Sequence, residues 1–230
     1  MRDNPELVWE VYQELEDEFL NLIKYVPLDP NHYQVWSNPL ASLLNNIGSS
    51  VDSFFKNAIL CPSIDDYSGI NEIRNEVHTH NMSTYRKIFN SRYRLANKKI
   101  YEIKTYSSIT PYSNWNEPST PQWWKDYTAI KHDRFRNEKK ATLKSTLEAL
   151  GGLFILYLNQ KETIPVLVDR DIINSRGLSK YVRKDIILRG EPTPTGAIIY
   201  AKTPLFGYVF ECEQSISEEE RKRILSSSLL

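Results

Sequence analysis

Apolar residues recur at three- and four-residue spacing in four stretches of this chain, the pattern of helices that bury one face. The first two stretches follow Asn4-Pro5 and Asn38-Pro39, and proline is favoured at the first position of a helix. The four stretches span residues 5–26, 39–61, 84–103 and 137–158. Amphipathic helices of about 20 residues can close around one core. The pattern therefore predicts a mainly α-helical protein built on an antiparallel four-helix bundle.

The fourth stretch contains a glycine pair, Gly151-Gly152. Each glycine costs about 1 kcal/mol relative to alanine inside a helix. Because the apolar spacing continues through the pair, we expect another helix to approach closely here.

The pattern changes after residue 160, where short β-branched or aromatic runs alternate with Gly, Pro and charged residues. The candidate strands are residues 164–168, 186–188, 197–201 and 208–210, and an acidic helix is expected from near Ser217. We therefore expect a bundle over residues 1–160 and a small α+β extension over residues 161–230 packed on it.

Length and composition limit the class of protein. A chain of 230 residues with 40% hydrophobic and 25% charged residues can build a sizeable core, which argues against disorder. No apolar run approaches the roughly 20 residues of a membrane helix. Cys61 and Cys212 stand far apart and in no paired motif, so neither a disulfide framework nor a zinc site is expected. We expect a cytoplasmic protein with no membrane association, metal or cofactor.

The formal net charge of zero hides a separation of charge along the chain. Residues 1–20 hold one cation and seven carboxylates, whereas residues 84–104 hold seven cations and one carboxylate, and residues 125–144 hold seven cations and three carboxylates. Basic segments with interleaved aromatic residues are typical of nucleic-acid surfaces. The candidate nucleic-acid contacts are Arg86, Arg92, Arg94, Lys98, Lys99, Trp123 and Trp124. Alternatively, the acidic first helix packs beside the basic third helix and neutralises it.

The connection predicted between the third and fourth helices, from about residue 105 to residue 136, exceeds the roughly 12–15 residues usual for a structureless loop. It contains Trp115, Trp123 and Trp124, whose apolar mass argues against disorder. Two roles are open for these tryptophans: a lid over the end of the bundle, or stacking on a base or another planar ligand.

Four polar residues gather at the end of this connection: Tyr127, Lys131, His132 and Arg134. A metal-free ribonuclease needs a base, an acid, and cations that stabilise the charged phosphorane. Histidine suits proton transfer near neutral pH, Lys131 and Arg134 would add positive charge, and the start of the fourth helix would add backbone donors. Alternatively, His132 braces the loop while its cationic neighbours face solvent.

A resemblance rests on these residues. PQWWKDYTAIKHDRFR, the following ATLKSTLEALGGLFIL and the earlier SNPLASLLNNIGSSVDSFFK resemble bacterial members of the HEPN-like superfamily, a likeness that covers residues 5–160. It implies a four-helix bundle, often a homodimer. Many members are metal-independent endoribonucleases of toxin–antitoxin, phage-defence or CRISPR-associated systems.

The ribonuclease hallmark of that superfamily is an arginine followed four to six residues later by a histidine. Upstream of His132 this chain has no arginine at that distance, and Thr128 follows Tyr127 where the resembling subgroup commonly has asparagine. A second match, Arg74 and His80, has the spacing, but it precedes the predicted third helix rather than the fourth, where the superfamily places the motif. His78 and His80 are also a partial metal pair, but no third ligand stands nearby, so no metal site is expected.

Two functions from different classes follow. The first is a HEPN-like nucleic-acid-associated protein, a metal-independent endoribonuclease of a phage-defence or toxin–antitoxin system, with Tyr127, Lys131, His132 and Arg134 as catalytic residues. Arg74 and His80 are the second catalytic candidates. Its partners would be RNA, a second copy, and an antitoxin or defence-system protein. The alternative is a non-catalytic HEPN-like module for interaction or dimerisation.

Overall fold

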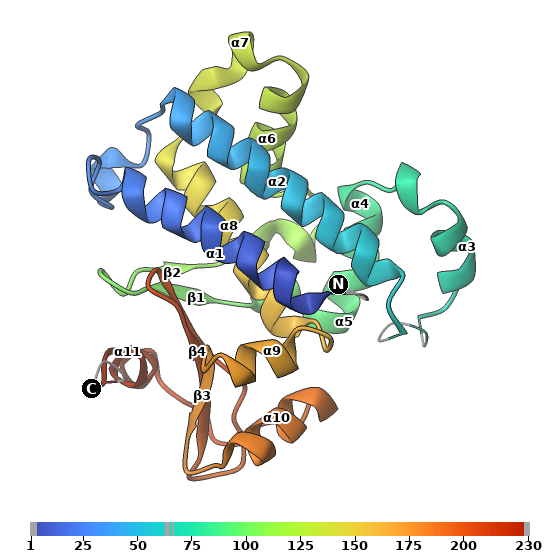
Figure 1. Cartoon of the computed structure of the whole chain (residues 1–230), viewed down its shortest axis with the longest axis vertical. Coiled ribbons are helices and arrows are strands. Elements are labelled where there is room, and N and C mark those ends of the chain that lie inside the picture. The colour runs from blue at the N-terminus through green and yellow to red at the C-terminus, as the bar shows by residue number, and fades with distance from the viewer. Residues whose placement is uncertain (1–3, 63–64, 66, 228–230) are drawn as a thin grey trace. The chain divides into compact units, whose positions relative to one another are not determined.

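The computed structural model describes residues 4–62, 65 and 67–227, which form two compact units (Figure 1). Unit 1 comprises the described residues of 1–98 and 110–156, and unit 2 those of 99–109 and 157–230. Most of the described chain is helical, so the prediction of a mainly α-helical protein is confirmed. Among the described helices, none combines the length and the apolar content that a membrane crossing requires.

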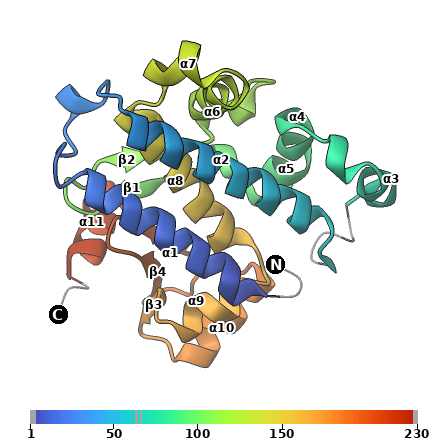
Figure 2. The same cartoon turned by 45° about the horizontal axis from the view of Figure 1, so that its top comes forward.

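The longer helices begin in unit 1, and two of them confirm the first two predicted helices. Asn4 Oδ1 accepts a hydrogen bond from Leu7 N at 3.0 Å, and Ser37 Oγ accepts one from Leu40 N at 3.3 Å, so a side chain caps each of those two helices. Figure 2 shows these two helices, α1 and α2, side by side. The longer helices are α1 (Pro5–Leu22), α2 (Asn38–Ile59), α6 (Gln122–His132) and α8 (Leu143–Asn159).

The other helical segments of unit 1 are short. They are η1 (Pro30–His32), α3 (Ile70–Asn75), η3 (Val77–Thr79), α4 (Met82–Tyr85), η4 (Arg86–Asn90), α5 (Ser91–Tyr93), η5 (Leu95–Asn97), η6 (Ser113–Asn116), α7 (Arg134–Asn137) and η7 (Glu138–Lys140).

The prediction of one continuous helix over residues 84–103 is wrong. The chain passes from α4 into the π-helical turn η4, and Arg94 then adopts a left-handed conformation with φ 52°, which stops the helix. The Asn90 side chain fixes this break, since its Oδ1 accepts from Ala96 N at 2.8 Å and its Nδ2 donates to Trp115 O at 3.1 Å. Residues 100–102 then form a strand of unit 2.

The region predicted as a long connection is largely ordered secondary structure. It contains α6 and α7, and α8 begins at Leu143 rather than near Asn137. The close approach predicted at the glycine pair is confirmed at Gly152, where a β-carbon would lie 3.2 Å from Trp123 of α6 and from the Tyr112 hydroxyl. A β-carbon at this position would therefore need the aromatic neighbours to shift by a few tenths of an ångström.

Unit 2 contains a five-stranded antiparallel sheet in the order β2-β1-β5-β4-β3. The predicted strands at 197–201 and 208–210 and the terminal acidic helix are confirmed as β4, β5 and α11. The runs at 164–168 and 186–188 are instead helical, because a short apolar run does not by itself distinguish strand from helix. The elements are β1 (Ile100–Glu102), β2 (Ser108–Ile109), α9 (Ile164–Asp169), β3 (Ile173–Arg176), α10 (Lys180–Arg189), β4 (Ile198–Lys202), β5 (Phe206–Val209) and α11 (Glu218–Ser227).

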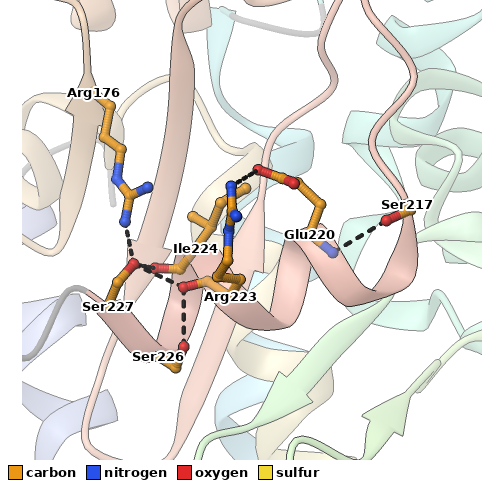
Figure 3. Close-up of polar contacts among 7 residues, drawn as sticks. All are labelled: Arg176, Ser217, Glu220, Arg223, Ile224, Ser226 and Ser227. Carbon is orange, nitrogen blue, oxygen red and sulfur yellow. Dashed lines mark hydrogen bonds and ion pairs between the residues drawn. The ribbon is translucent and has the colours of Figure 1, made fainter.

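Helix α11 lies on one face of this sheet and α9 and α10 lie on the other (Figures 1 and 2). The buried Ile224 and Leu225 of α11 pack against Tyr101 and Val209 of the strands. The close-up in Figure 3 shows its polar contacts, in which Arg176 of β3 donates to the Ser227 hydroxyl at the last turn.

Candidate nucleic-acid interface

Residues 131–140, which we call the basic corner, form a sharp change of direction in unit 1. Helix α6 ends because Asp133 leaves the helical conformation (φ −153°), and its carboxylate then caps α7 by accepting from Arg136 N at 3.2 Å. The Asn137 side chain donates to Ala129 O at 3.2 Å and to Asp133 O at 2.9 Å. These bonds hold the end of α6, α7 and η7 as one corner.

The basic corner carries exposed cations around an exposed aromatic ring. Phe135 is 93% exposed, and the five cations of the corner, all exposed, outnumber its two carboxylates. Trp36 adds a second accessible ring, 38% exposed, with Lys139 Nζ 5.9 Å from its centroid. The exposed cations are Lys131, Arg134, Arg136, Lys139 and Lys140.

The structure brings three of the four predicted catalytic side chains to this corner. Lys131, His132 and Arg134 are exposed there. Arg134 Nη2 also donates to Asn38 O and Ser42 Oγ, both at 3.0 Å, which ties α7 to the start of α2. The guanidinium therefore has a structural contact in addition to its charge.

Tyr127 differs from these three because its hydroxyl is enclosed. The side chain is buried against Gly48 of α2, and its hydroxyl has no hydrogen-bond partner among the described residues. Lys131 Nζ lies 5.6 Å from the centroid of the Tyr127 ring. In this structure Tyr127 therefore offers packing and a π surface for Lys131 rather than an accessible hydroxyl.

The expectation that the start of the fourth helix offers free backbone donors is wrong. Leu143 N donates to Val35 O at 2.8 Å and Lys144 N donates to Tyr33 O at 3.1 Å. The Thr142 hydroxyl accepts from the third amide of α8, that of Ser145, at 3.1 Å. The first turn of α8 is thus occupied by the connection between α1 and α2 and by its own cap.

Arg74 and His80 bond to backbone carbonyls. Arg74 Nε donates to Ile59 O at 2.8 Å, and its Nη2 contacts Cys61 O at 2.9 Å and Asp65 Oδ1 at 2.6 Å, so the guanidinium caps the C-terminal end of α2. His80 Nε2 lies 2.6 Å from Ile73 O. The described residues contain no group of three or more potential metal ligands.

The predicted nucleic-acid contacts are spread over both units. Arg94 is exposed in unit 1, whereas Lys99 is in unit 2, 3.5 Å from Glu218. Trp123 lies in the core and donates from Nε1 to Pro111 O at 2.9 Å, so its ring is not displayed for stacking, and Trp124 is half-buried against Tyr127. The remaining predicted contacts, each half-buried in unit 1, are Arg86, Arg92 and Lys98.

A pair of carboxylates between α6 and α8 was not anticipated from the sequence. Buried Asp126 accepts hydrogen bonds from Gln122 Nε2 at 2.8 Å and from Ser145 Oγ at 2.5 Å. Burial raises the pKa of Glu148, the Lys144 ammonium at 3.7 Å opposes that rise, and Asp126 reinforces it. The hydrogen bond between Ser145 and Asp126 joins α8 to α6 across the core.

The accessible rings of Phe135 and Trp36 were also missed. The only signal for Phe135 was its position in KHDRFRNEKK, where it is flanked by charges and has no apolar residue at helical spacing. Comparison with known proteins adds no assignment: no protein-family model matches the chain, and no curated protein or solved structure matches it.

Proposed function

We propose that this protein binds single-stranded RNA through the basic corner, as a HEPN-like nucleic-acid-associated protein. The observation that carries the proposal is the almost fully exposed ring of Phe135 between Arg134 and Arg136. An exposed ring is a stacking surface for an unpaired base, and flanking cations attract the adjacent phosphates. Lys131, Lys139 and Lys140 extend the positive surface.

The expected magnitudes favour binding that depends on both base stacking and phosphate contacts. Base stacking on an aromatic side chain contributes about 1–3 kcal/mol, and each neutralised phosphate of a single strand changes the slope of log K against log salt by about −0.7. The five cations of the corner therefore support a slope of roughly −3 if most of them contact phosphate.

The more specific proposal is that His132 makes the protein an endoribonuclease of a toxin–antitoxin or phage-defence system. Its exposure beside Lys131 and Arg134 supports this activity, as does the HEPN-like motif. A homodimer and an antitoxin or defence-system partner belong to the same proposal.

The alternative is a non-catalytic interaction module. The structural bonds of Arg74 and His80 and the enclosed Tyr127 hydroxyl favour it, because these groups serve the fold.

RNA binding is tested by fluorescence anisotropy of a labelled, unstructured 15-nucleotide RNA over a range of salt concentrations. Phe135→Ala should weaken binding about 5- to 150-fold, the equivalent of one lost stacking contact. Arg136→Gln with Lys140→Gln should make the salt slope shallower by about 1.4. Matched controls are Tyr25→Ala, which removes another ring that is 86% exposed, and Lys161→Gln, which removes an exposed cation of unit 2. Equal effects of Phe135→Ala and Tyr25→Ala would remove the proposal.

Cleavage is tested separately by incubating the same RNA with the protein in EDTA. The ribonuclease proposal expects cleavage that His132→Ala abolishes and His80→Ala retains, with melting curves confirming that both variants fold. Salt-sensitive binding without cleavage would leave RNA binding in place and remove the nuclease. Absence of both, with weaker dimerisation or folding in Trp124→Ala, would instead support the interaction module.

A further inference from the structure

We infer that residues 86–98, which we call the π segment, form a second RNA contact, placed so that one strand reaches both the π segment and the basic corner along α2. The inference rests on the proposed RNA binding and extends it from one contact to two. Both surfaces belong to unit 1.

The π segment is rich in basic residues. Residues 86–98 contain five cations and no carboxylate. Lys87 and Arg94 are exposed, and the three other cations are half-buried. Arg92 lies 5.9 Å from the centroid of the half-buried Tyr93 ring, which places an aromatic surface beside the charges.

The segment is also anchored on α2, so its charges need little ordering before they bind. Phe55 of α2 stacks on Tyr85 with centroids 4.6 Å apart and lies 4.9 Å from Phe89. Asn90 bonds close the turn that Arg94 makes in its left-handed conformation. A basic surface held by a packed core binds without the entropic cost of folding a loop.

Helix α2 sets the spacing between the two surfaces. Arg134 of the basic corner bonds to Ser42, the Tyr127 ring lies on Gly48, and the Tyr85 hydroxyl donates to Asp52 Oδ1 at 2.9 Å. Gly48 and Asp52 are four residues apart, so α6 and α4 contact α2 about 6 Å from each other along its axis. Ser42 and Asp52 are about 15 Å apart by the same rise per residue, which equals four to five nucleotides of a stacked strand at about 3.4 Å each.

The surface of α2 between these contacts does not repel phosphate. Its stripe at three- and four-residue spacing is half-buried to exposed, and four of its five members are neutral or cationic. The exception, Asp52, is the sole carboxylate of α2 and pairs with Lys56 at 2.6 Å. The stripe consists of Ser42, Asn45, Ser49, Asp52 and Lys56.

Two contacts on one strand predict a dependence on RNA length. A 3-nucleotide RNA is too short to span this distance and can occupy the basic corner alone, whereas a 15-nucleotide RNA can occupy both surfaces and gains from the second contact being intramolecular. Reversing charge in the π segment should therefore affect the long RNA and spare the short one.

The test measures anisotropy of 3- and 15-nucleotide unstructured RNAs with the full chain and with Lys87→Glu combined with Arg94→Glu. The variant should bind the 15-nucleotide RNA about tenfold or more weakly and the 3-nucleotide RNA within about twofold of the original protein. The charge-matched control is Lys24→Glu combined with Lys161→Glu, both at exposed positions, and should leave both affinities unchanged. Melting curves confirm that the variants fold.

Each other outcome overturns the inference in a recognisable way. Unchanged affinity for the long RNA would show that the π segment makes no second contact. An equal loss of affinity for the short and the long RNA would show that the substitutions act only through the net charge of the protein. The same sensitivity with a 15-base-pair duplex would make the ligand double-stranded rather than a single strand. Failure of Phe135→Ala to weaken either RNA removes the proposed function itself, which the π-segment variant alone does not do.

Discussion

The ring of Tyr127 on α6 lies so close to Gly48 of α2 that a β-carbon at position 48 would sit 2.3 Å from two ring atoms. The Tyr127 side chain is only 2% exposed, so the ring cannot swing into solvent to make room. This contact sets how closely α6 approaches α2, and with it where the basic corner begins.

Gly48→Ala should therefore destabilise the protein. Alanine gains about 1 kcal/mol of helix propensity, but overpacking of a core contact costs about 1–3 kcal/mol, and a clash with a buried ring lies at the upper end of that range. We expect a net loss of about 2 kcal/mol in urea unfolding. Asn46→Ala, at an exposed position on the same helix, controls for the change in helix propensity. A stabilised Gly48→Ala variant would contradict the contact.

Arg74→Ala should reduce stability without a specific loss of any RNA activity. Its removal leaves the Ile59 and Cys61 carbonyls without the guanidinium at the end of α2, and each unsatisfied buried group costs about 1–3 kcal/mol. Thermal or urea unfolding measures the loss, and Arg189→Ala, at an exposed arginine of α10, is the control. Normal stability with lost cleavage would return Arg74 to the catalytic candidates.

Glu148 should make stability depend on pH in a definite direction. Burial raises the pKa of Glu148 above its ordinary value, so the folded protein binds that proton more tightly than the unfolded chain does. This contribution to stability is fully present below the unfolded pKa of about 4.5 and is lost as the pH rises through the raised folded pKa. Glu148→Gln should therefore stabilise the protein at pH 7 relative to the original, with the gain shrinking as the pH falls to 4. Glu14→Gln, at an exposed site of α1, controls for removal of one negative charge.

Arg176→Ala should loosen the end of α11 while leaving global stability nearly unchanged. The guanidinium donates to the Ser227 hydroxyl, but buried Ile224 and Leu225 hold the helix to the sheet (Figure 3). We expect a change within about 0.5 kcal/mol in unfolding and faster amide exchange confined to the last turn. Faster exchange throughout α11 would mean that this one hydrogen bond, rather than the apolar contact, keeps the helix docked.

The sequence was informative wherever local chemistry decides the structure. Asn4 and the proline after it start α1 as predicted, and the apolar stripe of α2 is buried as its spacing indicates. Helix spacing failed at residues 100–102, because Arg94 interrupts the helix, and β2 nearby and β5 far along the chain supply strand partners. The run at 164–168 was too short for its period to decide between strand and helix.

The candidate site was only partly predictable for the same reason. The cationic residues around His132 are visible in the sequence, and their clustering follows from their being neighbours. Trp123 and Trp124 are adjacent and chemically identical, yet one is fully buried and the other half-buried, a difference that depends on the packing of α6. The capping role of Arg74 depends on the return of α3 to the end of α2, which no local pattern encodes.

The bonds of Asp133, Arg134 and Asn137 have a kinetic consequence. They hold the backbone on either side of Phe135 in place without a ligand, so RNA binding to the basic corner requires no rearrangement of a loop. Encounter would then be governed by long-range attraction to the surrounding cations, which added salt weakens, while the residence time would depend on the ring itself. Added salt should therefore lower mainly the association rate constant, whereas the Phe135 substitution should raise mainly the dissociation rate constant.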